Sequence, residues 1–148
     1  MAGAHREHPG GGRLIAPTLV EHDAAGQPFK VRFEQHHGYV RAYVHEGRDS
    51  LEVSIAMWQM LGTYCRAHGA TRLLVVEDLD GTVPLEQVDT VIAAMADAGF
   101  GAIRTAFVEL QDDLQGSEHG SILASERGVQ VYVTNDEFVA RHWLMYGE

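Results

Sequence analysis

The sequence predicts an α/β domain built on a mixed, mostly parallel sheet of about five strands, with its elements in the order ββαβαβαβα. Three observations lead to this prediction. Apolar and polar side chains alternate over residues 28–34 and again over 39–46, which is typical of two half-buried strands in a hairpin. Residues 73–76 are continuously apolar, as in a strand covered on both faces. Apolar stripes at helical spacing lie between the later strands.

The later strands are expected to run parallel to the second one, because helices long enough for a right-handed crossover join them. Only the first strand should then be antiparallel to the rest. Upstream, residues 13–27 contain a short apolar run followed by Pro17, a pattern that fits either a short edge strand or a loop. Residues 1–12, which include three consecutive glycines, are expected to form a flexible tail before a single domain at 13–148.

The first helix is predicted from its cap and its apolar face. Asp49 and Glu52 have the spacing of a capping box, so the helix is expected to begin there and to run to about residue 68. Trp58 and Cys65 fall on its apolar face. We therefore interpret both as core residues.

Two more strands and three more helices complete the pattern. The second helix is expected to start near Pro84, which suits a first helical turn. Strands are predicted at 103–108 and 129–133, with a helix over about 113–127 between them. A capping box over 134–137 opens the last helix.

Composition and charge exclude several classes of function. The chain has 11 basic and 21 acidic residues, and its formal net charge of −10 repels nucleic acid and anionic membrane surfaces. Its only cysteine cannot form an internal disulfide, the first ten residues lack the apolar stretch of a signal peptide, and no apolar run approaches the roughly 18 residues of a membrane span. We expect a cytoplasmic protein without a nucleic acid partner or a membrane span.

Several local stretches between residues 29 and 146 form a recognisable pattern. They are 58–65 with Ala67-His68-Gly69, the strand 72–78 with Gly81, Gly99-Phe100, Ala106-Phe107-Val108, Glu126-Arg127-Gly128 and Trp143-Leu144. Together with the order of elements, these stretches resemble the sporulation anti-anti-sigma-like branch of the STAS fold family, which is related to the CRAL-TRIO lipid-binding fold. The resemblance implies a small non-enzymatic module that binds a regulatory protein partner.

The best understood members of that family are switched by phosphorylation of a serine where the third-strand loop enters its helix. The corresponding stretch here is Asp78-Leu79-Asp80-Gly81-Thr82, in which Thr82 is the only hydroxyl and two carboxylates precede it. A phosphate on Thr82 would be repelled by these neighbours, so the switch is not expected to carry over. The resemblance still points to a partner or regulatory surface made of Asp78, Asp80, Gly81, Thr82 and Pro84.

The same stretch also matches the opening motif of haloacid-dehalogenase-type phosphatases. In that class the first aspartate, here Asp78, attacks phosphate, the second, here Asp80, is the general acid and base, and Mg²⁺ neutralises the phosphoryl oxygens. Two features weigh against this function. The only lysine, Lys30, lies upstream of the motif, and Pro84 leads straight into a helix without room for a flap.

Acidic residues gather where the strands end, as at Glu77, Glu109 and Asp112-Asp113. Such an edge can hold Mg²⁺ or Ca²⁺, but each of these loops precedes a helix, whose N-terminus itself stabilises a carboxylate by about 0.3–1 kcal/mol. The histidines do not show three converging ligands either. We therefore predict neither a metal site nor a cofactor.

The third helix is unusually thin, because Gly116, Gly120 and Gly128 alternate with small residues. Such a helix either packs closely against a neighbour or leaves an unfilled groove beside the sheet. If a groove exists, its apolar lining is expected to come from Phe107, Ile122, Leu123 and Trp143.

The sequence thus favours a non-enzymatic STAS-like binding or regulatory module that acts through a protein partner or through self-association. No complete catalytic set is visible. Two alternatives stay open, a protein that binds a small apolar molecule or lipid, and a Mg²⁺-dependent phosphatase.

Overall fold

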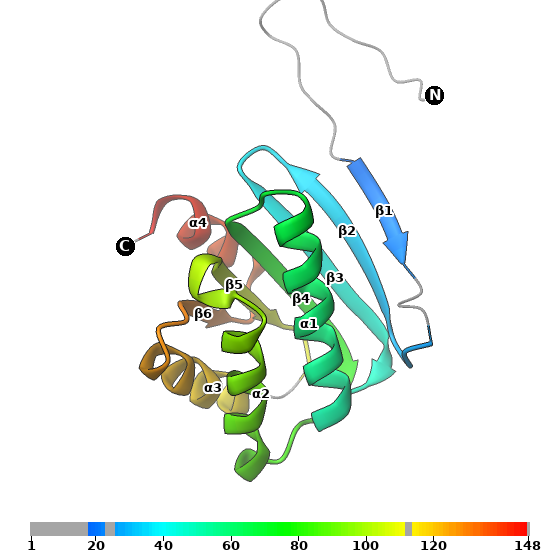
Figure 1. The fold of residues 1–148 in the computed structure, drawn as a ribbon, viewed down its shortest axis with the longest axis vertical. Coiled ribbons are helices and arrows are strands. Elements are labelled where there is room, and N and C mark those ends of the chain that lie inside the picture. Colours follow the sequence, from blue (N-terminus) through cyan, green and yellow to red (C-terminus); the bar gives the residue numbers. More distant parts are fainter. Residues whose placement is uncertain (1–17, 23–25, 112–113, 148) are drawn as a thin grey trace, which may run out of the picture.

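The computed structural model describes residues 18–22, 26–111 and 114–147, so the predicted tail at 1–12 lies outside the described residues. The strands are β1 (Thr18–His22), β2 (Lys30–His36), β3 (Tyr39–Arg48), β4 (Arg72–Asp80), β5 (Arg104–Glu109) and β6 (Val131–Thr134) (Figure 1). The helices are α1 (Leu51–Ala67), α2 (Val88–Asp97), α3 (Leu114–Glu126) and α4 (Glu137–Tyr146), with 3₁₀ turns η1 (Leu85–Gln87) and η2 (Phe100–Ala102) on either side of α2.

The described strands form one sheet in the order β1-β2-β3-β4-β5-β6. Strand β2 is antiparallel to both neighbours, whereas β3, β4, β5 and β6 are parallel to one another. The predicted α/β class with a mixed, mostly parallel sheet is therefore confirmed. The additional strand, β1, lies in the segment for which the sequence left both an edge strand and a loop open.

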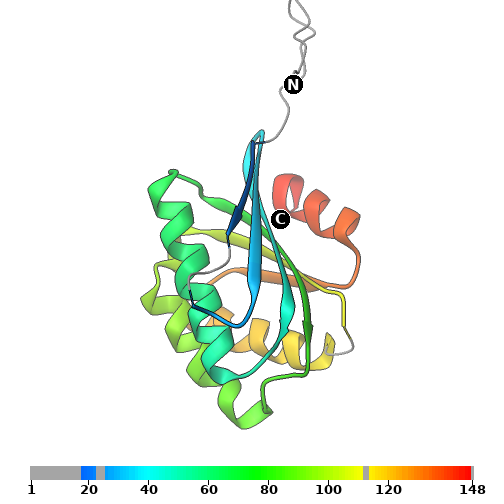
Figure 2. The ribbon, with the colours of Figure 1, turned by 90° about the vertical axis from the view of Figure 1, so that its right-hand side faces the viewer.

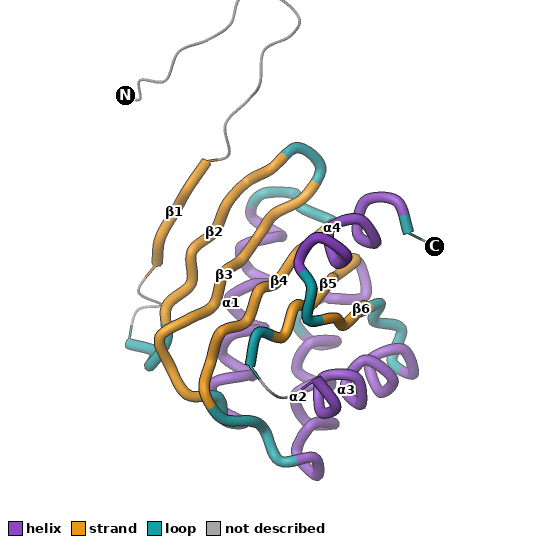
Figure 3. The backbone as a smooth tube through the Cα atoms, turned by 180° about the vertical axis from the view of Figure 1, so that it is seen from behind, coloured by secondary structure: helices purple, strands orange, loops and turns teal. Residues whose placement is uncertain are grey.

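The winding of the chain decides which face each helix covers. Each crossover from β3 to β6 moves one strand further in the same direction, and right-handed crossovers then place α1, α2 and α3 on one face of the sheet, here called the α-face. In the view of Figure 2, α4 lies on the opposite side of the sheet from α1. Seen from behind, α4 crosses in front of the sheet (Figure 3).

The larger core lies under the α-face. Strands β2 to β5 send alternate side chains into it, namely Val31, Phe33, Val40, Ala42, Val44, Leu73, Val75 and Phe107. Trp58 and Cys65 of α1 are buried in this core, as predicted, and the Trp58 ring meets Phe100 edge-on with 5.2 Å between ring centroids. Period-2 alternation in the strands thus supplies one wall, and the stripe on α1 supplies the other.

A smaller core fills the opposite face. Leu74, Val76, Ala106 and Val108 pack there under Ala140 and Leu144 of α4. The apolar run at 73–76 is therefore buried on both faces, as predicted. Arg104 anchors the end of α4, because its guanidinium stacks on Trp143 at 3.7 Å and donates hydrogen bonds to the carbonyls of Trp143 and Gly147.

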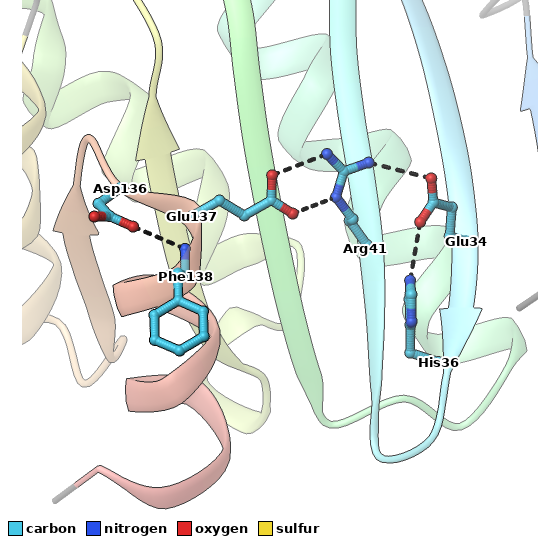
Figure 4. Close-up of polar contacts among 6 residues, drawn as sticks. All are labelled: Glu34, His36, Arg41, Asp136, Glu137 and Phe138. Carbon is cyan, nitrogen blue, oxygen red and sulfur yellow. Dashed lines mark hydrogen bonds and ion pairs between the residues drawn. The ribbon is translucent and has the colours of Figure 1, made fainter. Parts of the chain in front are cut away.

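Arg41 ties the start of α4 to the hairpin of β2 and β3 (Figure 4). Its Nε and Nη2 donate to the two carboxylate oxygens of Glu137 at 2.6 and 3.1 Å, and its Nη1 donates to Glu34 at 3.2 Å. The other oxygen of Glu34 lies 2.9 Å from Nε2 of His36. The hydrogen bonds to Glu137 raise the pKa of Arg41 above its ordinary value, so the guanidinium of this bidentate contact stays charged.

Two helices begin later than the capping boxes predict. Ser50, not Asp49, caps α1, and its Oγ accepts the N–H of Val53 at 3.1 Å. In α4 the cap is Asp136, whose Oδ1 accepts the N–H groups of Phe138 and Val139. In both cases several capping residues are adjacent in the sequence, and the local backbone direction selects one of them.

Removing the cation at Arg41 should weaken the attachment of α4. We expect Arg41→Met, which keeps an apolar stem, to lower the free energy of unfolding by about 1–2 kcal/mol, since the lost hydrogen bonds join charged but partly exposed groups. Arg127→Met is the control, because its ion pair with Asp89 is exposed on both sides and is expected to cost less than about 0.5 kcal/mol. Equal losses in urea titrations of the two variants would contradict this role.

Cys65 should be chemically inert in the folded protein. Burial raises the pKa of its thiol from 9.0 to about 11, so the native chain holds about a hundredfold less thiolate at pH 8 than the unfolded chain. We expect alkylation by iodoacetamide to be slower in the native protein by at least that factor. The neutral thiol is favoured on folding, so its contribution to stability is full below pH 9 and is lost as the pH rises towards 11.

Candidate ligand pocket

A pocket opens on the α-face, between the sheet, α1, α2 and α3. Its cavity volume is about 90 Å³, and it widens into an open mouth. Most of its walls are apolar and come from Trp58, Val83, Val88, Val91, Ile92, Met95, Phe107, Val131 and Val133. A concave, largely apolar site near the carboxyl ends of parallel strands is where α/β sheets bind small molecules.

Two buried glutamates form the polar end of this pocket. Glu77 lies in the carboxyl-terminal half of β4 and Glu109 ends β5, and the two are register partners on neighbouring strands. They share the face of Val75 and Phe107, and they are only 5% and 3% exposed. The backbone N–H of Gln111 and the hydroxyl of Ser117 donate to the two oxygens of Glu109 at 3.1 and 3.3 Å. These bonds fix the Glu109 carboxylate in place.

The start of α1 adds a third carboxylate to the pocket lining, Asp49. Its Oδ1 accepts the Ser50 N–H at 2.8 Å and the hydroxyl of the buried Ser54 at 2.7 Å. Asp49 therefore turns toward the helix that it precedes. We call Asp49, Glu77 and Glu109 the acidic end of the pocket.

The thin third helix forms one wall of this pocket. Gly116 and Gly120 both line it, together with Ser117 and Ser121. A Cβ added at Gly120 would lie 3.4 Å from Val88 and 3.7 Å from Ile92, which is ordinary van der Waals contact. At position 120 a single methyl group would already touch α2, so the glycine lets α3 lie close to α2 beside the pocket.

The four residues predicted to line a groove do not share one site. Phe107 lines the pocket, and Leu123 packs against the larger core, but Ile122 is 61% exposed. Trp143 lies on the opposite face of the sheet, because α4 follows the last strand without a further crossover and covers the other side. Sequence periodicity places Trp143 on an apolar face of its helix but does not say which face of the sheet that helix covers.

The predicted partner surface is divided between two environments. Asp78 points to the face of α4, where its oxygens accept the hydroxyl of Tyr43 at 3.0 Å and the side-chain amide of Gln111 at 2.6 Å. The bond to Asp78 raises the pKa of Tyr43 above its ordinary value. The other members, Asp80, Gly81, Thr82 and Pro84, are exposed at and beyond the end of β4.

In the sequence, Glu77 and Glu109 were visible only as members of an acidic edge, and Asp49 only as a predicted helix cap. Glu77 differs from Asp78 by a single step along a strand, and that step sends the two side chains to opposite faces. Glu77 lies two residues after Val75 on β4, and Glu109 lies two residues after Phe107 on β5. This period-2 spacing was the signal that could have placed both glutamates on the same face of the sheet. The register that aligns β4 with β5 depends on the tertiary structure, so it could not be predicted from the sequence.

No family model matches this chain, and no curated protein matches it. Within the part of the chain that the structure describes, no group of three or more His, Cys, Asp or Glu side chains is placed to hold a metal ion. The described helices also include none that is long and apolar enough to cross a membrane. Of the two aspartates of the phosphatase-like motif, Asp78 is hydrogen-bonded on the face opposite the pocket, and Asp80 is exposed at the end of β4.

Proposed function

We propose that this chain is a non-enzymatic binding module of the STAS-like kind, acting in the cytoplasm, whose α-face pocket takes one small, mainly apolar molecule. The observation that carries the proposal is the pocket itself, with apolar walls from α1, α2 and the sheet and a wall of glycines and serines from α3. Burying apolar ligand surface there gains about 25 cal/mol per Å². The lining supports binding, and we assign no reaction to it.

A protein partner is the second candidate, and the loop after β4 favours it. Val83 lines the pocket, while its neighbours Thr82 and Pro84 are exposed and Leu85 is 56% exposed. A ligand against Val83 would therefore bias the conformation of the surface that the STAS-like resemblance implicates in partner binding. In this proposal the ligand binds in the pocket, and the loop after β4 binds the protein partner.

The first test uses the two tryptophans, which lie on opposite faces of the sheet. In Trp143→Phe the remaining Trp58 lines the pocket and reports on it alone. We expect N-phenyl-1-naphthylamine, a neutral apolar fluorophore, to bind with 1:1 stoichiometry, to gain emission and to quench Trp58. The protein is purified without detergent, and native mass spectrometry of the same sample checks for a ligand carried from the cell.

Two variants of α3 make this test specific. Gly120→Met puts a flexible side chain where Val88 and Ile92 line the pocket, and we expect it to weaken binding of the probe about tenfold or more. His119→Met puts the same side chain at an exposed position of the same helix and should leave binding unchanged. If both variants bind the probe equally well, or if the Trp143→Phe parent does not bind it, the proposed function is wrong.

A further inference from the structure

Strand β6 is an edge of the described sheet, and it has none of the features that usually protect a strand edge. Proteins block such edges with charged residues, prolines or bulges. Residues 129–135 contain no charged residue and no proline, and β6 pairs with β5 in continuous register. The strand at the other edge, β1, includes Glu21. The edge of β6 is therefore suited to pairing with a further strand.

The backbone groups available for this pairing belong to Val131 and Val133. The N–H of Thr105 donates to the carbonyl of Gln130 at 3.1 Å, which sets the phase of the parallel ladder between β5 and β6. In such a ladder, alternate residues turn their N–H and C=O groups toward the neighbouring strand. Residues 130, 132 and 134 therefore bond to β5, and Val131 and Val133 direct their backbone groups outward.

Exposed apolar side chains of α4 lie beside this edge. Strand β6 lies between α4 and α3 (Figure 3). The Trp143 ring of α4 stacks on Tyr132 of β6 with 4.9 Å between ring centroids, so this side of α4 faces β6. Val139 and Tyr146 lie four residues before and three residues after Trp143, on the same side of the helix. They are 40% and 75% exposed.

The other flanking helix, α3, also exposes an apolar side chain there. Ser121 and Ser125 line a hollow beside the first residues of β6. Ile122, three residues before Ser125 on the same side of α3, is 61% exposed. The β6 edge is thus flanked by apolar surface on both helices.

The area that a stable complex needs favours a second copy of this chain at the edge. Specific interfaces bury about 1,200 Å² or more in total, which a strand of four residues does not supply. The occupant must therefore also cover the exposed side chains of α3 and α4. A second copy does so, because it brings its own α3 and α4 alongside, whereas a lone extended peptide covers the strand only.

We propose that β6 is the interface of a homodimer, in which it pairs antiparallel with β6 of a second copy about a two-fold axis at Tyr132. In this register Val131 of each copy lies opposite Val133 of the other, and each such pair exchanges both of its N–H to C=O hydrogen bonds. The two Tyr132 side chains form an aromatic cross-strand pair at the axis. Because residues 129–135 are uncharged, two chains of net charge −10 meet there without like charges in the strands.

Analytical ultracentrifugation of the full chain tests the pairing. We expect a monomer–dimer equilibrium that tightens as NaCl rises from about 0.05 to about 0.5 M, since salt screens the repulsion between two acidic chains. Ile122→Lys, which places two cations beside the axis, should raise the dissociation constant about tenfold or more. Val133→Pro should do the same, because it removes an outward N–H and spares the ladder with β5.

Phe138→Lys is the matched control for Ile122→Lys. Phe138 is 67% exposed and contacts Arg141, on a side of α4 away from the one that carries Trp143. Both lysine variants change the net charge equally, so a difference between them reports on the place of the substitution. We expect Phe138→Lys to dimerise like the parent chain.

Hydrogen exchange at the Val131 and Val133 amides locates the interface. We expect both amides to exchange about tenfold or more slowly once the protein concentration is well above the dissociation constant. A chain that stays monomeric, with these amides exchanging equally fast at every concentration, overturns the proposal and leaves a strand of another protein as the occupant. A dimer that Phe138→Lys dissociates and Ile122→Lys does not overturns it in favour of the outer side of α4. Should Val133→Pro not fold, the two lysine variants still decide.

Discussion

The handedness of the crossovers is the constraint on which the rest of this molecule depends. From β3 to β6 the sheet grows in one direction only, so every right-handed crossover returns on the same face. Three of the described helices consequently share the α-face, and among them α4 alone covers the other side. The hydrogen bonds from Arg41 to Glu137 and the stack of Arg104 on Trp143 then hold this single helix at both ends.

The same constraint explains where the pocket lies. The third crossover is made by a helix with glycine at two positions that line the pocket, Gly116 and Gly120. At Gly120 α3 lies close against Val88 and Ile92 of α2, and further along Ala124 and Leu123 pack against the larger core. The space that remains adjoins the carboxyl ends of β4 and β5, where the backbone presents Glu77 and Glu109.

Local sequence patterns were sufficient to predict the strands and helices and many of the core residues. Alternation predicted that Val40, Ala42 and Val44 share a face, and the continuous run from Leu73 to Val76 predicted a strand buried on both sides; both predictions are confirmed. These succeed because the period of a strand or helix is a property of a few consecutive residues. The caps at Ser50 and Asp136 were missed by one and two residues, since several neighbouring side chains can cap and the backbone decides between them.

The site was less predictable, because its geometry is set by elements distant in the sequence. The glycines of α3 indicated that a groove could lie beside this helix, and a pocket is found there. The sequence did not show that Trp143 lies on the other face of the sheet, or that Glu77 and Glu109 are register partners. An acidic residue before a helix is explained equally well as a helix-capping group. Only the alignment of β4 with β5 distinguishes a pocket wall from a solvated loop.

The most direct test of the central claim, that the α-face pocket is the ligand site, is a methyl spectrum of valine-labelled protein titrated with 1-octanol. The pocket is lined by Val83, Val88, Val91, Val131 and Val133, whereas Val76 and Val108 lie in the core of the opposite face. We expect saturable changes in methyl chemical shift, and contacts with 1-octanol, for the five pocket valines and not for Val76 and Val108. Shifts centred on Val76 and Val108, or none at all, would contradict it.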